Sequence, residues 1–147
     1  MKILILLSII GISSNAFSAE FLVKMTRASG FSPMPRSSQL IITEDGKITS
    51  VVNVQSKITK SAVGTLSAKA LTNLKDTIER IADDAVLVDL DAKRPQCADA
   101  PGRRVEINKG GKTLIVSAVR NCHKYEVADA DASNLSKLAE SLDSIAR

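Results

Sequence analysis

The stretch that decides the fold is Ser38-Gln-Leu-Ile-Ile-Thr-Glu-Asp-Gly-Lys-Ile-Thr-Ser-Val-Val-Asn-Val54. Its flanks are rich in Ile and Val, which favour β-strands. Between them, Asp45-Gly46 is a strong signal for a tight hairpin turn. We therefore predict an antiparallel hairpin with strands over 38–43 and 47–54.

A second hairpin is predicted further along the chain. Residues 104–107 alternate between polar and apolar, Lys109-Gly110-Gly111 forms a turn, and 112–120 returns. Alternation over 21–27 predicts an opening strand, and a short strand is expected over 86–88. The polar residues 55–64 are interpreted as a connection and 89–102 as a loop containing prolines.

Each hairpin is followed by apolar residues at helical spacing. Ser67 can cap the first helix, and Asp131 or Ser133 the second. The two stripes share one spacing and comprise Leu71, Leu74, Ile78 and Ile81 in the first, and Leu135, Leu138, Leu142 and Ile145 in the second. We expect all eight side chains to be buried against a sheet.

The predicted fold class is α+β, an opening strand followed by two ββα units. It has an antiparallel sheet of about five strands with both amphipathic helices on one face, because one-sided helices need an apolar surface to cover. Few residues are identical between the two ββα units. Their common order of elements is therefore explained equally well by duplication and by the same physical requirements acting on unrelated sequences.

The N-terminus has the three parts of a secretory signal. Lys2 is followed by an apolar run over 3–12 and then by small residues. Cleavage after Ser18 would place Ala16 at −3, so residues 1–18 are predicted to be a cleaved signal peptide. The apolar run of about ten residues is too short to span a bilayer, so no stable membrane anchor is expected. Residues 19–147 are predicted to form a single exported domain, periplasmic or extracellular.

Composition argues against nucleic-acid binding. The net charge is only +4, and the chain has three Phe, one Tyr and no Trp. Nucleic-acid binders usually concentrate positive charge and offer stacking platforms. The two cysteines, Cys97 and Cys122, are expected to form one disulfide in an oxidising compartment.

No catalytic or metal site is predicted. Cys122 and His123 are neighbours that point to opposite faces of a strand, which argues against a Cys/His nucleophile. The available Cys and His are too few for a zinc site. The acidic residues, which are Asp83, Asp84, Asp89 and Asp91, lack the turn glycine of a calcium loop. We therefore expect a protein that is not an enzyme and has no cofactor.

One candidate binding site is basic. The expected disulfide would draw cationic side chains together into a patch for acidic glycans, lipid headgroups or an acidic protein surface. These side chains are Arg94, Arg103, Arg104, Arg120 and Lys124.

The other candidate is the 27–36 loop, because glycine and prolines over 30–35 end regular pairing there. Prolines stiffen this loop, which presents Phe31 and Met34, and a pre-ordered loop loses little entropy on binding. Alternatively, both side chains tuck over a sheet edge or under a helix.

The stretch Thr26-Arg-Ala-Ser-Gly-Phe31 resembles the opening of the emfourin-type proteins, small inhibitors of thermolysin-like metalloproteases. The resemblance extends to the order of elements: a hairpin, a helix starting with Leu66-Ser67, a second hairpin and a C-terminal helix. It implies a protease-binding role for the matching residues Arg27, Ser29, Gly30 and Phe31. The two cysteines and the Pro-Met-Pro run over 33–35 depart from the family pattern and leave the protease target open.

The functional expectation is an exported, non-enzymatic domain that binds a protein partner through the 27–36 loop, with a metalloprotease as the partner that the resemblance implies. The alternative is an envelope interaction module that binds an anionic ligand through the basic residues. The sequence indicates no oligomeric state.

Overall fold

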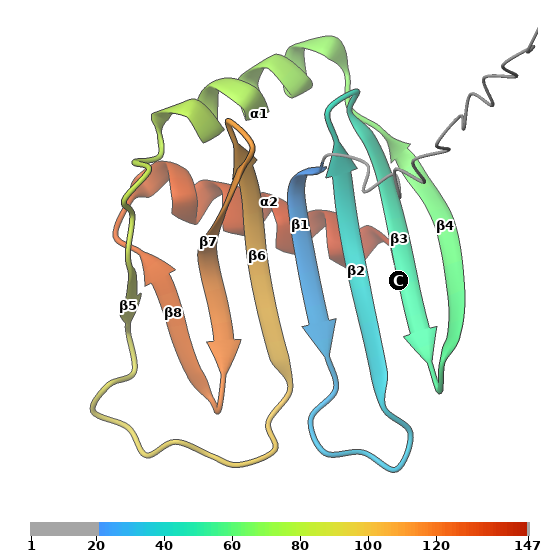
Figure 1. The fold of residues 1–147 in the computed structure, drawn as a ribbon, viewed down its shortest axis with the longest axis vertical. Coiled ribbons are helices and arrows are strands. Elements are labelled where there is room, and N and C mark those ends of the chain that lie inside the picture. Colours follow the sequence, from blue (N-terminus) through green and yellow to red (C-terminus); the bar gives the residue numbers. More distant parts are fainter. Residues whose placement is uncertain (1–20, 147) are drawn as a thin grey trace, which may run out of the picture.

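The computed structural model describes residues 21–146, and the predicted signal peptide over 1–18 lies outside them. The described residues form one antiparallel sheet of eight strands and two helices (Figure 1). The strands are β1 (Phe21–Ala28), β2 (Arg36–Thr43), β3 (Lys47–Val54), β4 (Lys57–Thr65), β5 (Leu87–Asp89), β6 (Gly102–Lys109), β7 (Lys112–Arg120) and β8 (His123–Val127). The helices are α1 (Ala68–Arg80) and α2 (Ala130–Ile145).

The strand order is β4-β3-β2-β1-β6-β7-β8-β5, with β1 in the interior of the sheet. β1 pairs with β2 on one side and with β6 on the other, both antiparallel. A three-strand meander extends outward on each side, and each meander is followed in the chain by a helix. The repeating unit is therefore βββα, where the sequence predicted ββα.

The α+β class is confirmed, but the prediction of a sheet of about five strands is wrong. The structure adds β4 in the stretch interpreted as a polar connection and β8 just before α2, and the short strand expected near 86–88 joins the same sheet as β5. Both β4 and β8 follow two-residue turns that lack glycine. Gln55 and Ser56 have φ of 49° and 68°, and Asn121 and Cys122 have φ of 50° and 66°. Hairpin turns with two positive φ values usually carry Asn-Gly or Gly-Gly, so neither turn has a strong sequence signal.

β4 also escapes detection because it is an edge strand. Almost all of its residues are exposed, with Val63 as the exception at the margin of the core. A strand covered on neither face has no apolar alternation to reveal it. Its two lysines, Lys57 and Lys60, are typical of edges that resist pairing with other chains.

The two helices occupy different places on the sheet. α2 lies across one face, behind the strands in Figure 1. α1 runs along one end, from the β2–β3 turn, where Leu66 N donates to Gly46 O at 2.9 Å, to the β6–β7 turn. The two helices pack against each other, and α1 adds Leu74 and Ile78 to the core. The prediction of two equivalent helices on one face is corrected accordingly.

The core lies between the sheet and the helices. Its fully buried residues include Met25, Ile42, Val105, Ile107, Ile78, Ile81 and Leu135. The strands contribute alternate residues to this side, as in Val23 and Met25 of β1 or Leu40 and Ile42 of β2. The sequence showed this alternation for β1, whereas β2 was predicted from its Ile content and the Asp-Gly turn that follows it.

The buried face of α2 differs from the predicted one. The buried residues of α2 are Ala132, Leu135, Ser136, Ala139 and Asp143. Leu138 is 38% exposed and lines a groove between the helices, and Ile145 is 72% exposed. The face of α2 that points to the sheet is thus rotated away from the predicted leucine stripe. Small residues on this face, such as Ala132 and Ala139, allow the helix to lie close to the sheet. Its cap is Asp129, which accepts from Asp131 N and Ala132 N, where Asp131 or Ser133 was predicted.

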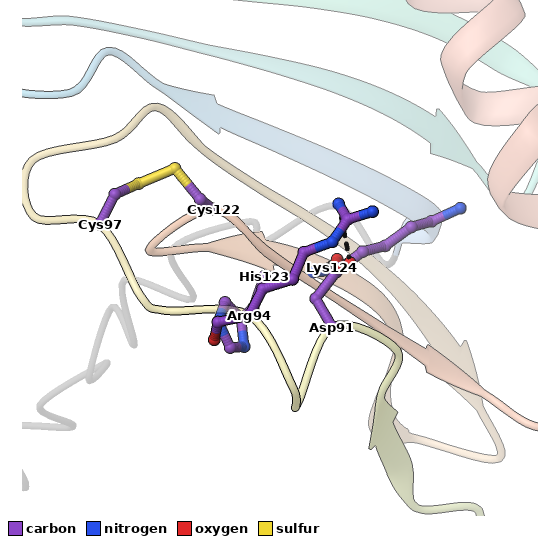
Figure 2. Close-up of a disulfide and its surroundings, with 6 residues drawn as sticks. All are labelled: Asp91, Arg94, Cys97, Cys122, His123 and Lys124. Carbon is purple, nitrogen blue, oxygen red and sulfur yellow. Dashed lines mark hydrogen bonds and ion pairs between the residues drawn. A yellow bond between two sulfur atoms is a disulfide. The ribbon is translucent and has the colours of Figure 1, made fainter.

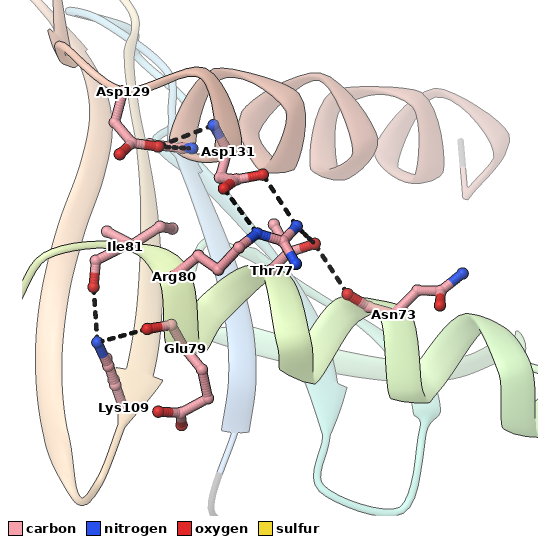
Figure 3. Close-up of polar contacts among 9 residues, drawn as sticks. Asn73, Thr77, Glu79, Arg80, Ile81, Lys109, Asp129 and Asp131 are labelled. Carbon is pink, nitrogen blue, oxygen red and sulfur yellow. Dashed lines mark hydrogen bonds and ion pairs between the residues drawn. The ribbon is translucent and has the colours of Figure 1, made fainter.

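The C-terminal end of α1 is held by polar contacts (Figure 3). Arg80 Nε and one terminal nitrogen donate to the two carboxylate oxygens of Asp131 at 2.9 and 3.1 Å. Lys109 Nζ donates to the carbonyls of Glu79 and Ile81 at 2.9 and 2.6 Å, which caps otherwise unpaired helix carbonyls. At the other end, Ser67 Oγ accepts from Ala70 N, as predicted for a cap.

Candidate functional site

The 27–36 loop joins β1 to β2 and projects from the end of the sheet opposite α1 (Figure 1). Phe31 is 87% exposed and Met34 is 59% exposed. Of the two alternatives raised by the sequence, the structure places both side chains in solvent and not against a sheet edge or helix. A large apolar side chain exposed to this degree is a candidate contact for a partner.

Hydrogen bonds order the loop from within. Ser29 N donates to Arg36 O at 2.8 Å, and Arg36 N donates to Ser29 Oγ at 3.0 Å, so the two ends of the loop are joined. Nearer the tip, Met34 N donates to Ser32 Oγ at 3.2 Å. The loop therefore has a defined shape before any partner arrives.

Gly30 lies where the loop meets the long connection between β5 and β6. A Cβ on Gly30 would lie 1.9 Å from the carbonyl oxygen of Asp99 and 2.9 Å from the carbonyl carbon of Ala100, so no larger residue fits. The neighbouring Phe31 N donates to Asp99 O at 3.1 Å. Gly30 thus allows the loop backbone to lie against the backbone of the β5–β6 connection, and this contact holds the backbone of Phe31 in place.

The β5–β6 connection is itself anchored to the β7–β8 turn (Figure 2). The predicted disulfide is confirmed and joins Cys97 to Cys122, with 5.7 Å between their Cα atoms. Next to it, Cys97 N donates to Asn121 O at 3.1 Å. Lys124 N donates to Asp91 Oδ2 at 3.0 Å. The disulfide therefore secures the segment against which Gly30 and Phe31 lie.

His123 is buried beside this disulfide, with only 3% of its surface exposed. Its Nδ1 lies 2.8 Å from Asp89 Oδ2 and its Nε2 lies 3.0 Å from Arg94 O. Both partners are acceptors, so both ring nitrogens can donate only when the imidazole is protonated. The bond to Asp89 raises the pKa of His123 above 6.5, and the same bond lowers the pKa of Asp89 below 3.8. Because both cysteines are in the disulfide, His123 has no thiolate to activate.

Three of the four acidic residues named from the sequence have structural partners. Asp83 pairs with Lys109 at 2.9 Å, Asp89 with His123, and Asp91 with Arg94 at 3.2 Å. Within residues 21–146, no three metal-ligating side chains gather into a site.

The basic residues do not form one patch. Arg103 pairs with Glu140 of α2, while its neighbour Arg104 points to the opposite face and lies 3.6 Å from Glu106. The others also have local partners: Arg94 pairs with Asp91, Lys124 with Glu126 at 2.8 Å, and Arg120 lies over the Tyr125 ring at 4.7 Å.

A feature that the sequence did not predict lies under the 27–36 loop. A trough of about 630 Å³ opens on the helix-covered face of the sheet, beside the end of α2. Its polar lining comprises Arg27, Ser29, Arg36, Ser38, Ser50 and Asp143, and we refer to these residues as the α2 trough. They come from three strands, the loop after β1 and one helix, so only the strand register and the position of α2 bring them together. Arg27 and Ser29 were named as candidate binding residues and Arg36 ends the predicted binding loop, whereas Ser38, Ser50 and Asp143 were not predicted.

Among the helices of the described chain, none is both long and apolar enough to cross a membrane. In the comparisons with known proteins, no protein-family model matches this chain, and no curated protein matches it.

Proposed function

We propose that this chain is an exported, non-enzymatic domain that binds a protein partner through the 27–36 loop. The observation that carries this proposal is the exposure of Phe31, 87% in a loop whose base is held by hydrogen bonds. Interface energy concentrates in a few large side chains that become buried on binding. A loop that is already ordered loses little further entropy when it binds.

The proposed partner class is a thermolysin-like metalloprotease. Support comes from the resemblance of Thr26–Phe31 to the emfourin-type inhibitors and from the structural role of Gly30 within that motif. Export is supported by the Cys97–Cys122 disulfide, because such bonds persist mainly in oxidising compartments.

The test is Phe31→Ala, with Val86→Ala as the matched control. Val86 is 74% exposed and precedes β5, at the sheet edge opposite β4. Phe31→Ala should weaken binding by about 2 kcal/mol or more, roughly thirtyfold in Kd, with little change in melting temperature. The assay is inhibition of a thermolysin-like metalloprotease, with a serine protease as the comparison enzyme. Binding to a partner recovered from periplasm or culture medium extends the test beyond proteases.

The outcomes separate the alternatives. If Phe31→Ala lowers stability and leaves binding intact, Phe31 is a structural residue and the proposal fails. If neither protease is inhibited, the protease class is withdrawn. The anion-binding alternative stays a prediction, with less support because its basic residues have separate partners. It predicts loss of the partner in high salt, whereas contacts through Phe31 should survive.

A further inference from the structure

The α2 trough lies next to the proposed binding loop. Arg27 and Ser29 stand at the start of that loop, Arg36 at its end, and Ser38 and Ser50 follow on β2 and β3. In the sheet register, Arg27 is opposite Ser38, and Ser50 is opposite Leu40. A partner that contacts Phe31 would therefore lie within reach of the trough.

The charged groups of the lining are unequal in number. The lining holds two arginines, Arg27 and Arg36, and one acidic residue, Asp143. Arg27 Nε lies 2.7 Å from Asp143 Oδ2, so these two charges match. Arg36 is exposed and makes no ion pair with any residue in the described range 21–146. Among the described residues that line the trough, the formal charges therefore sum to one positive charge.

The backbone of Arg36 is held in place although its side chain has no ion-pair partner. Its N–H donates to Ser29 Oγ, its carbonyl accepts from Ser29 N, and it pairs with Val54 of β3. The Arg36 side chain thus starts from a fixed backbone position, and Arg36 shares the lining of the trough with Ser38 and Ser50. A guanidinium fork with neighbouring hydroxyl donors suits a planar oxyanion, which it binds through two parallel hydrogen bonds.

We infer that the α2 trough is a subsite for a carboxylate group of the protein partner, either an acidic side chain or a C-terminus. This inference rests on the proposed function and specifies what the partner presents: an apolar site for Phe31 with a carboxylate close by. A monoanion matches the single net charge of the lining. A phosphate dianion would exceed that charge, and Asp143 and the negative end of α2 would repel it more strongly than they repel a monoanion.

Small probes test this subsite without the partner. The disulfide-bonded mature protein is titrated by NMR with N-acetylglycine as the carboxylate and with N-acetylglycinamide as its neutral counterpart. We expect saturable shifts of the Ser29, Arg36, Ser38 and Ser50 amides with the acid and none with the amide. Arg36→Gln should weaken this binding by about tenfold or more, as expected for loss of a charge-assisted contact.

The control variant is Lys69→Gln, because Lys69 is an exposed cation near the start of α1, at the end of the sheet opposite the 27–36 loop, and should not affect the titration. The subsite is refuted by absence of saturation, by equal shifts with the neutral amide, or by an unchanged response in folded Arg36→Gln. Tighter binding of inorganic phosphate than of N-acetylglycine refutes the assignment to a carboxylate.

The same titration on Phe31→Ala separates this inference from the proposed function. Probe binding should be unchanged in that variant, because Phe31 does not line the trough. If Phe31→Ala has no effect on the partner, the loop proposal fails while the trough result stands. If probe binding is absent while Phe31→Ala does weaken the partner, the subsite alone is refuted.

Discussion

The guanidinium of Arg27 lies 2.7 Å from the carboxylate of Asp143 and joins β1 to the last turns of α2. Arg27 is directly opposite Arg103 in the β1–β6 register, and like charges at such positions are destabilising. Arg103 in turn pairs with Glu140 at 2.7 Å. Two carboxylates of α2 therefore offset two adjacent arginines of the sheet, and both ion pairs favour the observed rotation of the helix.

Asp143→Ala should lower the free energy of unfolding by about 2 kcal/mol, because it leaves Arg27 partly buried beside Arg103 without its counter-charge. Denaturant unfolding measures the change. A double-mutant cycle with Arg27→Gln should give a favourable coupling energy between the two side chains. Strictly additive effects would show that the ion pair does not hold α2 in place.

Leu135→Ala should cost about 2–5 kcal/mol of stability, because Leu135 is 2% exposed within the core. Leu138→Ala is the matched control on the same helix, and it should cost less than about 1 kcal/mol because Leu138 is 38% exposed. Thermal and denaturant unfolding compare the two variants. Equal losses would mean that α2 is rotated toward its leucine stripe.

Stability should depend on pH through His123. Its pKa is raised in the folded protein by Asp89, so this contribution is complete below about pH 6.5 and is lost as pH rises through the raised value. We expect the melting temperature to fall, as pH rises above about 6.5, by more in the wild type than in His123→Gln. Since the chain has one histidine, no other imidazole contributes. The same pH dependence in both proteins would exclude His123 as its source.

Acid should also weaken the interaction between His123 and Asp89, in this case by protonating Asp89. The pKa of Asp89 is lowered by His123, so its contribution is present above its ordinary value near 3.8 and is lost as pH falls through the lowered value. Asp89→Asn should therefore flatten the acid limb of the stability profile. An unchanged acid limb would show that Asp89 is not responsible.

Gly30→Ala should separate the 27–36 loop from the β5–β6 connection, because its Cβ would lie 1.9 Å from Asp99 O. We expect a lower melting temperature and faster hydrogen exchange of the Phe31 amide, which donates to that oxygen. Gly64→Ala is the control, since no atom lies within 4 Å of its added Cβ. Unchanged exchange at Phe31 would contradict the contact.

Maturation can be checked by intact mass of the exported protein. We expect a chain that starts at Ala19 or Glu20 and is two hydrogens lighter than its reduced form, because of the Cys97–Cys122 disulfide. A full-length chain, or two thiols that alkylate without reduction, would contradict this expectation.

Local signals in the sequence were sufficient for several elements. Asp45-Gly46 and Gly110-Gly111 mark the β2–β3 and β6–β7 turns, where Gly46, Gly110 and Gly111 adopt positive φ. Ser67 marks the start of α1, and the two cysteines form the expected disulfide. The turns and the helix cap each depend on a few neighbouring residues. The disulfide follows from the presence of two cysteines, since each has only the other as a partner.

The tertiary structure alone decided the remaining strands, the rotation of α2 and the α2 trough. β4 and β8 follow turns without glycine, so their strands form because partner strands are present. Asp143 is buried and pairs with Arg27, which is far away in the sequence. Arg27, Arg36 and Ser50 meet only through the register of three strands. These contacts join residues that are far apart in the sequence. The sequence could not predict them, because hydrophobic periodicity and turn propensity describe only residues that are close together in the chain.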